Sequence, residues 1–165
     1  MNIAAKLHKI VSLDNHLFLP EMYRRVLNRE PDEEGLSQHS RQLAKGRPKH
    51  RIMIDFLQSD EALEWFSAPT SLERTEQEAP VYAMIQRVFA RKPEPFVHSL
   101  YRELLCREPD QPAYSGYVER LHRGSSKASV FKQFVTSGEF ESLLGLEPYP
   151  FAKRVLDQLI LSFYQ

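Results

Sequence analysis

The sequence contains a long internal repeat, and this repeat limits what the chain can fold into. The stretch LNREPDEEGL at 27–36 returns as LCREPDQPAY at 105–114. When the chain is shifted by 78 residues, 18–62 aligns with 96–140 without a gap, and 15 of the 45 aligned positions are identical. A repeat of this length predicts two copies of one structural unit, in which the identical residues have the same role in both copies.

The repeat divides the chain into two units, a linker and a tail. We place the first unit at 1–66 and the second at 81–145. The segment between them, 67–80, reads SAPTSLERTEQEAP, and its polar, proline-bounded composition predicts a linker. The tail, 146–165, predicts a C-terminal helix that is apolar on more than one face. It either packs between the units, begins a further domain, or self-associates through residues 150–164.

Each unit has the pattern of helices. Apolar residues recur every three or four positions, as in Phe18, Met22 and Val26. Gly46 and Gly124 stand where a helix would end in a left-handed residue. No segment alternates with period two over enough residues to predict a strand. The predicted fold class is therefore all-α, with two homologous helical units and a C-terminal apolar helix.

The REPD motif predicts a corner between two helices. Its proline ends one helix, because the ring disfavours helical geometry in the preceding residue. Asp32 and Asp110 are then placed to cap the next helix. Arg29 and Arg107 can reach back to that aspartate or to carbonyl groups at the end of the preceding helix. We therefore interpret these four residues as a structural corner used twice.

The same residues resemble a known family. The motif with its surrounding tyrosine, glycine, phenylalanine and glutamate resembles a widespread bacterial helical family of unknown function, numbered four-two-one-four. Its helical signature is also similar to the linker repeats of phycobilisomes, the light-harvesting antennae of cyanobacteria. The first copy departs from the family in having Gln38 and His39 where an aromatic pair is usual, and both copies lack the usual glycine before the REPD arginine. The residues that carry the resemblance are Phe18, Tyr23, Leu27, Arg29, Glu30, Pro31, Asp32, Gly35, Leu36, Leu43, Gly46, Phe56, Ser59 and Glu61, with Phe96, Tyr101, Leu105, Arg107 to Asp110, Tyr114, Leu121, Gly124, Phe134, Ser137, Glu139 and Phe140 in the second copy.

Composition excludes several classes of function. The 22 basic and 22 acidic residues cancel, which disfavours a nucleic-acid partner. The single cysteine, Cys106, and the absence of an HExxH pair predict neither a metal nor another cofactor. No apolar run is long enough to span a membrane, and residues 1–11 lack the pattern of a secretory signal, so we expect a cytoplasmic protein. No nucleophile elbow or phosphate-binding loop is present, so we expect no catalytic residues.

One short basic segment is a candidate binding site. RQLAKGRPKHR, at 41–51, contains five cations and no acid: Arg41, Lys45, Arg47, Lys49 and Arg51. An anionic glycan or phosphate ligand is one explanation. Complementing the negative end of a helix is the other, but it does not explain the three cations that follow Gly46.

The resemblance and these patterns together predict the function. The resemblance implies a non-catalytic interaction module, of a kind found beside bacterial glycosyltransferases and in envelope proteins. Its partner would be a protein or an acidic glycan or phosphate ligand, and Tyr114 and Tyr117 could stack on a sugar or a partner. The alternative is a small cytoplasmic adaptor that binds an acidic ligand through the basic segment.

Overall fold

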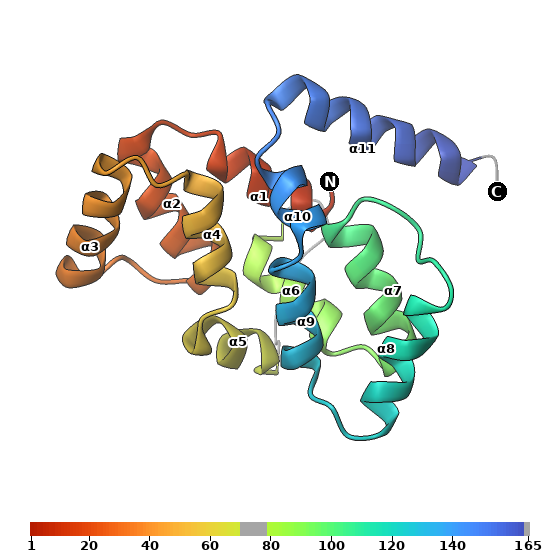
Figure 1. Cartoon of the computed structure of the whole chain (residues 1–165). Helices are drawn as coiled ribbons and strands as arrows, with labels where there is room; N and C mark the ends of the chain where they lie inside the picture. Colours follow the sequence, from red (N-terminus) through yellow and green to blue (C-terminus); the bar gives the residue numbers. More distant parts are fainter. Residues whose placement is uncertain (70–78, 164–165) are drawn as a thin grey trace.

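The computed structural model describes residues 1–69 and 79–163, and all of the regular elements in them are α-helices (Figure 1). The predicted all-α fold is confirmed. Residues 70–78 of the predicted linker and residues 164–165 of the predicted tail lie outside the described residues. The helices are α1 (Ile3–Val11), α2 (Asn15–Leu27), α3 (Glu33–Ala44), α4 (Lys49–Leu57), α5 (Asp60–Ser67), α6 (Val81–Phe89), α7 (Pro93–Leu104), α8 (Ala113–His122), α9 (Lys127–Val135), α10 (Gly138–Leu144) and α11 (Pro148–Phe163).

The two copies of the repeat fold into the same succession of five helices. Helices α1–α5 correspond to α6–α10, and the contacts between the copies are reciprocal. Helix α6 packs against α2 and α5 of the first copy, and α1 packs in turn against α7 and α10 of the second. The first helix of each copy is therefore buried against the other copy.

A single hydrophobic core runs through both copies. Phe131 of α9 is 1% exposed, and its ring packs edge-on to that of Phe66 in α5, with 5.6 Å between the ring centroids. The ring of Phe89 in α6 lies 5.2 Å from the same Phe131 ring. Buried residues of both copies belong to one continuous cluster, so the two copies are expected to stabilise each other.

Several helix ends are fixed by serine caps and left-handed glycines, and most of these residues are identical in the two copies. The hydroxyls of Ser59 and Ser137 accept hydrogen bonds from backbone N–H groups three residues on, at 3.2 Å in each case. Ser126 caps α9 in the same way, at 3.1 Å. Gly46 and Gly124 have φ values of 86° and 101°, a left-handed geometry that costs other residues about 1 kcal/mol or more. The two glycine terminators that the sequence predicts, Gly46 and Gly124, are confirmed.

Helix α11 is attached to the rest of the molecule mainly by its first turns. Phe151 is 5% exposed, and its ring stacks on that of His8 in α1 at 3.9 Å. His8 also makes a 2.7 Å hydrogen bond to the Leu146 carbonyl, just before the helix. Farther along, α11 extends over the start of α1 and the α7 side of the molecule (Figure 1). Its last apolar side chains are exposed: Leu156, Leu159, Ile160, Leu161 and Phe163.

Candidate functional site

The arginine of each REPD motif ties a corner to the last helix of its unit. Nε and Nη2 of Arg29 donate to both carboxylate oxygens of Glu61, at 2.7 and 3.1 Å. Arg107 makes the same two bonds to Glu139, at the same distances. Each guanidinium also lies 4.9 Å from the centroid of a tyrosine ring, that of Tyr23 or Tyr101. A lysine ammonium cannot reproduce this bidentate contact or its stacking on the tyrosine ring.

The glutamate of each motif is held by the helix that precedes it. Arg24 Nε donates to Glu30 at 2.7 Å, and Arg102 Nε lies 3.3 Å from Glu108. These arginines are a further identical pair in the repeat. The arginine and the glutamate of each motif therefore both have partners within the molecule.

The residue before each REPD arginine has a left-handed backbone. Asn28 and Cys106 both have φ of 52°. In each corner the following arginine N–H donates to the tyrosine carbonyl of the preceding turn, at 3.4 and 3.3 Å. Glycine adopts this geometry without a steric cost, which accounts for its usual presence at this position in the family that the sequence resembles.

The charged groups of the corner form stable ion pairs rather than a site whose protonation changes. The bonds from Arg107 to Glu139 and Asp110 raise the pKa of the Arg107 guanidinium far above its ordinary value, so it stays charged. Burial raises the pKa of the Tyr101 phenol beneath it. Burial likewise raises the pKa of the Cys106 thiol, which is 2% exposed, so that the reactive thiolate is disfavoured.

The prediction that Asp110 caps a helix is wrong. Helix α8 begins at Ala113, after Pro112, and no side chain caps its first N–H groups. The Asp110 carboxylate instead accepts a 2.6 Å hydrogen bond from Arg107 Nη1. Pro112 stands where the first copy has Glu34 and disfavours helical geometry in Gln111, so α8 starts two positions later along the repeat than α3. In the first copy Asp32 is a true cap, since its Oδ1 accepts from the Gly35 N–H at 2.6 Å.

The two aspartates should therefore respond differently to the same substitution. We expect Asp32→Ala to lower the midpoint of thermal unfolding by about 2–4 °C, because it removes a helix cap. Asp110→Ala removes only an exposed contact to an arginine that keeps Glu139, and we expect a shift of less than about 2 °C. Differential scanning calorimetry of both variants measures this. Equal shifts in the two variants would show that capping is not the difference between the corners.

The structure disperses the cations of the basic segment instead of gathering them around one pocket. Arg47 pairs with Asp55, and Arg51 Nε donates to Glu141 of the second copy at 2.9 Å. The Lys49 ammonium donates to the Leu13 carbonyl, and its counterpart Lys127 donates likewise to the Arg91 carbonyl. Three of the five cations are therefore explained by contacts within the fold. The other two, Arg41 and Lys45, are exposed at the end of α3.

The two predicted stacking tyrosines face the second copy's own side chains. The Tyr117 ring lies 5.1 Å from that of Phe134, and the Tyr114 hydroxyl donates to the Glu94 carbonyl at 3.3 Å. Both are half-buried and pack against the hydrophobic core. Only part of each ring is therefore available to a sugar or a partner.

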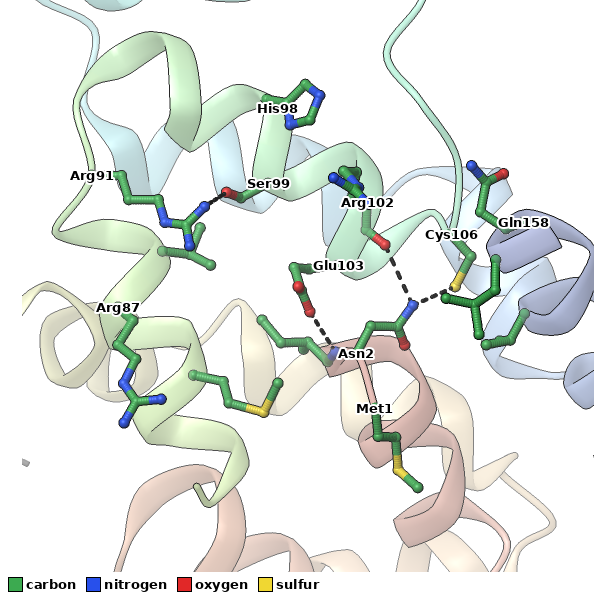
Figure 2. A pocket seen from close by; sticks show the side chains of 15 residues that line it. Met1, Asn2, Arg87, Arg91, His98, Ser99, Arg102, Glu103, Cys106 and Gln158 are labelled. Carbon is green, nitrogen blue, oxygen red and sulfur yellow. Dashed lines mark hydrogen bonds between the residues drawn. The ribbon is translucent and has the colours of Figure 1, made fainter. Parts of the chain in front are cut away.

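A pocket with a volume of about 570 Å³ lies beside the second corner, whose Cys106 lines it, between the start of α1, helices α6 and α7, and α11. Three arginines line it: Arg87 and Arg91 from the α6 side, and Arg102 from α7. Figure 2 shows Arg87 and Arg91 on one side, Cys106 and Gln158 on the other, and Glu103 and Asn2 between them. Arg91 Nη1 donates to the neutral Ser99 hydroxyl at 2.7 Å, a bond that leaves its charge uncompensated.

The remaining polar groups of this pocket hold α1 in place. Glu103 accepts a 2.9 Å hydrogen bond from the Ile3 N–H at the start of α1, where a carboxylate is favoured by the helix dipole. The Asn2 amide donates to the Cys106 sulfur at 3.2 Å and to the Arg102 carbonyl at 3.4 Å. The pocket therefore has a structural side, at α1, and a cationic side, at α6.

Sequence reasoning missed this pocket, although the repeat contains a signal for it. Of the three arginines and one glutamate in its lining, only Arg102 is identical in the first copy. Arg91 and Glu103 are replaced there by Leu13 and Arg25. Arg91 and Glu103 are therefore specific to the second copy, where Glu103 also holds the start of α1.

Two other kinds of feature are absent from the part of the chain that the structure describes. Within 1–69 and 79–163, no three histidine, cysteine, aspartate or glutamate side chains come together in a way that could hold a metal ion. Among the same residues, no helix combines the length and the hydropathy needed to cross a bilayer.

The fold and the two corners define an all-helical protein built from two copies of one unit. Residues 5–66 and 77–144 each match the family described as Domain of unknown function (DUF4214). The matched segments cover well over half of the chain, which therefore belongs to this family, as the sequence resemblance indicated. No curated protein and no solved structure matches the chain significantly.

Proposed function

We propose that this protein is a non-catalytic helical interaction module that works beside a glycosyltransferase or elsewhere in a bacterial envelope polysaccharide system. The setting rests on the family resemblance. The observation that carries the interaction role is the outer face of α11. It leaves large apolar side chains exposed on a molecule whose other exposed large hydrophobic residues, among those described, are Met1 and Leu17.

The exposed residues of α11 form a stripe. Leu156, Leu159, Ile160 and Phe163 are spaced three and four residues apart, and they are 46–85% exposed. This spacing places them on one side of the helix, next to the side on which Phe151 and Val155 pack toward α1. Leu156 and Leu159 also line the groove between α11 and α1. An apolar stripe with this period is the pattern by which one helix packs along another.

The occupant that we propose for this stripe is the same stripe of a second copy. Two identical helices related by a two-fold axis present the same apolar face to each other, so one surface suffices for both partners. Association would remove the exposed apolar area from water, which is the main driving force for helix pairing in solution.

The acidic-ligand adaptor proposed as the alternative has less support at the basic segment. Arg47, Lys49 and Arg51 have intramolecular partners there, so a ligand at 41–51 would meet mainly Arg41 and Lys45.

Light scattering behind a sizing column tests the self-association. We expect the 1–165 chain to shift from monomer toward dimer as its concentration rises, because the stripe is buried only in the pair. Ile160→Glu together with Phe163→Glu should leave a monomer at every concentration. The control is Leu17→Glu, which places one such charge at an exposed apolar residue of α2 and should still dimerise.

Two outcomes would contradict this proposal. A wild-type chain that stays monomeric at all concentrations has no self-complementary stripe, and equal loss in the control means that α11 is not the interface. The setting is tested separately, by whether the gene encodes or adjoins a glycosyltransferase.

A further inference from the structure

We propose that the groove between α1 and α11 binds a fatty acid, with its alkyl chain along the two helices and its carboxylate at Lys9. The family description assigns no ligand to this place. The proposal is independent of the pairing of α11, because Ile160 and Phe163, the residues that test the pairing, lie outside the lining of the groove.

The groove has one polar end and one apolar end. The His8 ring of α1 stacks on the Phe151 ring of α11, with 3.9 Å between the ring centroids. Met1 precedes His8 and Leu159 follows Phe151, and both line the groove, so α1 and α11 run antiparallel along it. Lys9 lies at the His8 end, and Met1 and Leu159 lie at the other.

The size and the lining of the groove suit an alkyl chain. Its volume is about 500 Å³, which is within the range of small-molecule sites, and such sites are mostly apolar with a few placed polar groups. Ala5 of α1 and Ala152 of α11 keep the groove open, since neither side chain is larger than a methyl group. Val155 and Leu156 supply apolar surface, from which a bound chain would displace water.

A single cation at the polar end favours an anionic head group. Among the described residues that line the groove, Lys9 is the only one with a fixed charge, and none is acidic. Lys9 is exposed and makes no ion pair with any residue that the structure describes. Helix α1 contains no acid, and the one acid of α11, Asp157, lies outside the lining. A negative group beside Lys9 therefore meets no like charge from the two helices.

The head group that fits is a carboxylate rather than a phosphate monoester. A phosphate monoester carries nearly two negative charges at neutral pH and is best held by several charged donors. The groove offers one ammonium, and the nearby Ser12 hydroxyl already donates to the His8 carbonyl at 2.8 Å. One lysine complements the single charge of a carboxylate.

Isothermal titration of the whole chain with sodium dodecanoate tests the proposal, below the micellar concentration and in dilute protein. We expect saturable binding with one site per chain. Decanoate should bind at least about fivefold more weakly, since burial of each methylene tightens binding about fourfold. Dodecanol, which lacks the charge, should bind about two- to fivefold more weakly than dodecanoate. Dodecyl phosphate should bind no more tightly than dodecanoate.

The head-group contact is tested by Lys9→Glu. This variant should weaken dodecanoate binding at least about threefold, because it replaces an attracting charge with a repelling one, and should leave dodecanol binding unchanged. The matched control is Lys132→Glu, which makes the same change at an exposed lysine of α9 and should bind dodecanoate as wild type does.

The chain site is tested by filling the groove from either helix. Ala152→Phe and Ala5→Phe should each weaken the binding of dodecanoate and of dodecanol at least about tenfold, because several methylenes lose their buried surface. Ala113→Phe adds the same ring at an exposed alanine of α8 and should leave binding unchanged. Ile160→Glu with Phe163→Glu should also leave it unchanged, and unaltered thermal unfolding checks that the variants are folded.

Four results would overturn the proposal. The first is no saturable binding of dodecanoate, and the second is equal weakening by Lys9→Glu and Lys132→Glu, which would indicate attraction by net charge alone. The third is loss of binding in the Ile160→Glu and Phe163→Glu variant, which would place the alkyl chain on the exposed stripe of α11. The fourth is tighter binding of dodecyl phosphate than of dodecanoate.

Discussion

Phe131→Ala should destabilise the protein by about 3–5 kcal/mol, because it truncates a large ring at the centre of the core. The Phe131 ring is 1% exposed and packs against Phe66 of the first copy and Phe89 of the second. Truncation removes the transfer free energy of a buried ring and leaves a cavity where the copies meet. Urea unfolding followed by far-UV circular dichroism measures the change.

Phe163→Ala is the matched control for that substitution. Phe163 is 85% exposed on α11, so in dilute, monomeric protein the same truncation should change the free energy of unfolding by less than about 0.5 kcal/mol. A loss of stability below about 1 kcal/mol in Phe131→Ala would contradict the shared core.

Arg107→Ala should cost about 1–2 kcal/mol. It removes two charge-assisted hydrogen bonds to Glu139 and a cation–π contact with Tyr101, and we reduce the sum of these contributions because about a third of each charged side chain is exposed. Arg107→Lys should recover less than half of this loss, since an ammonium cannot make the two parallel bonds. Chemical denaturation of both variants gives the two values.

The comparison for Arg107 is Arg123, whose pair with Glu119 is largely exposed. Arg123→Ala should change the stability by less than about 0.5 kcal/mol. If Arg107→Lys is as stable as wild type, the two-pronged bond is not what makes arginine necessary in the REPD motif.

The sequence was sufficient to predict the all-α fold, its two homologous units and some of the helix ends. Those features depend on local chemistry, such as a serine that accepts from an N–H three residues on, or a glycine with positive φ. The error at Asp110 is also local, because Pro112 disfavours helical geometry in Gln111, which the analogy with the first copy had placed in the first turn of the helix. That one residue contains the signal from which the later start of α8 could have been predicted.

Long-range partners could not be predicted in the same way. Arg29 and Glu61 are both conserved between the copies, yet they are 32 residues apart, and no spacing rule joins them. Likewise, Arg51 reaches Glu141 in the other copy only because α4 and α10 pack together. The basic segment 41–51 is contiguous in sequence but dispersed in space, whereas the arginine pocket is dispersed in sequence and contiguous in space.

The continuous core is the central claim about this molecule, and the fluorescence of Trp65 tests it most directly. Trp65 is the single tryptophan and lies in α5 of the first copy, whereas Phe131 lies in α9 of the second. We expect the fluorescence and circular-dichroism transitions in urea to coincide in the wild-type chain, and both to move together to lower urea in Phe131→Ala. A Trp65 transition that keeps its wild-type midpoint in this variant would show that the first copy unfolds on its own, and would contradict a shared core.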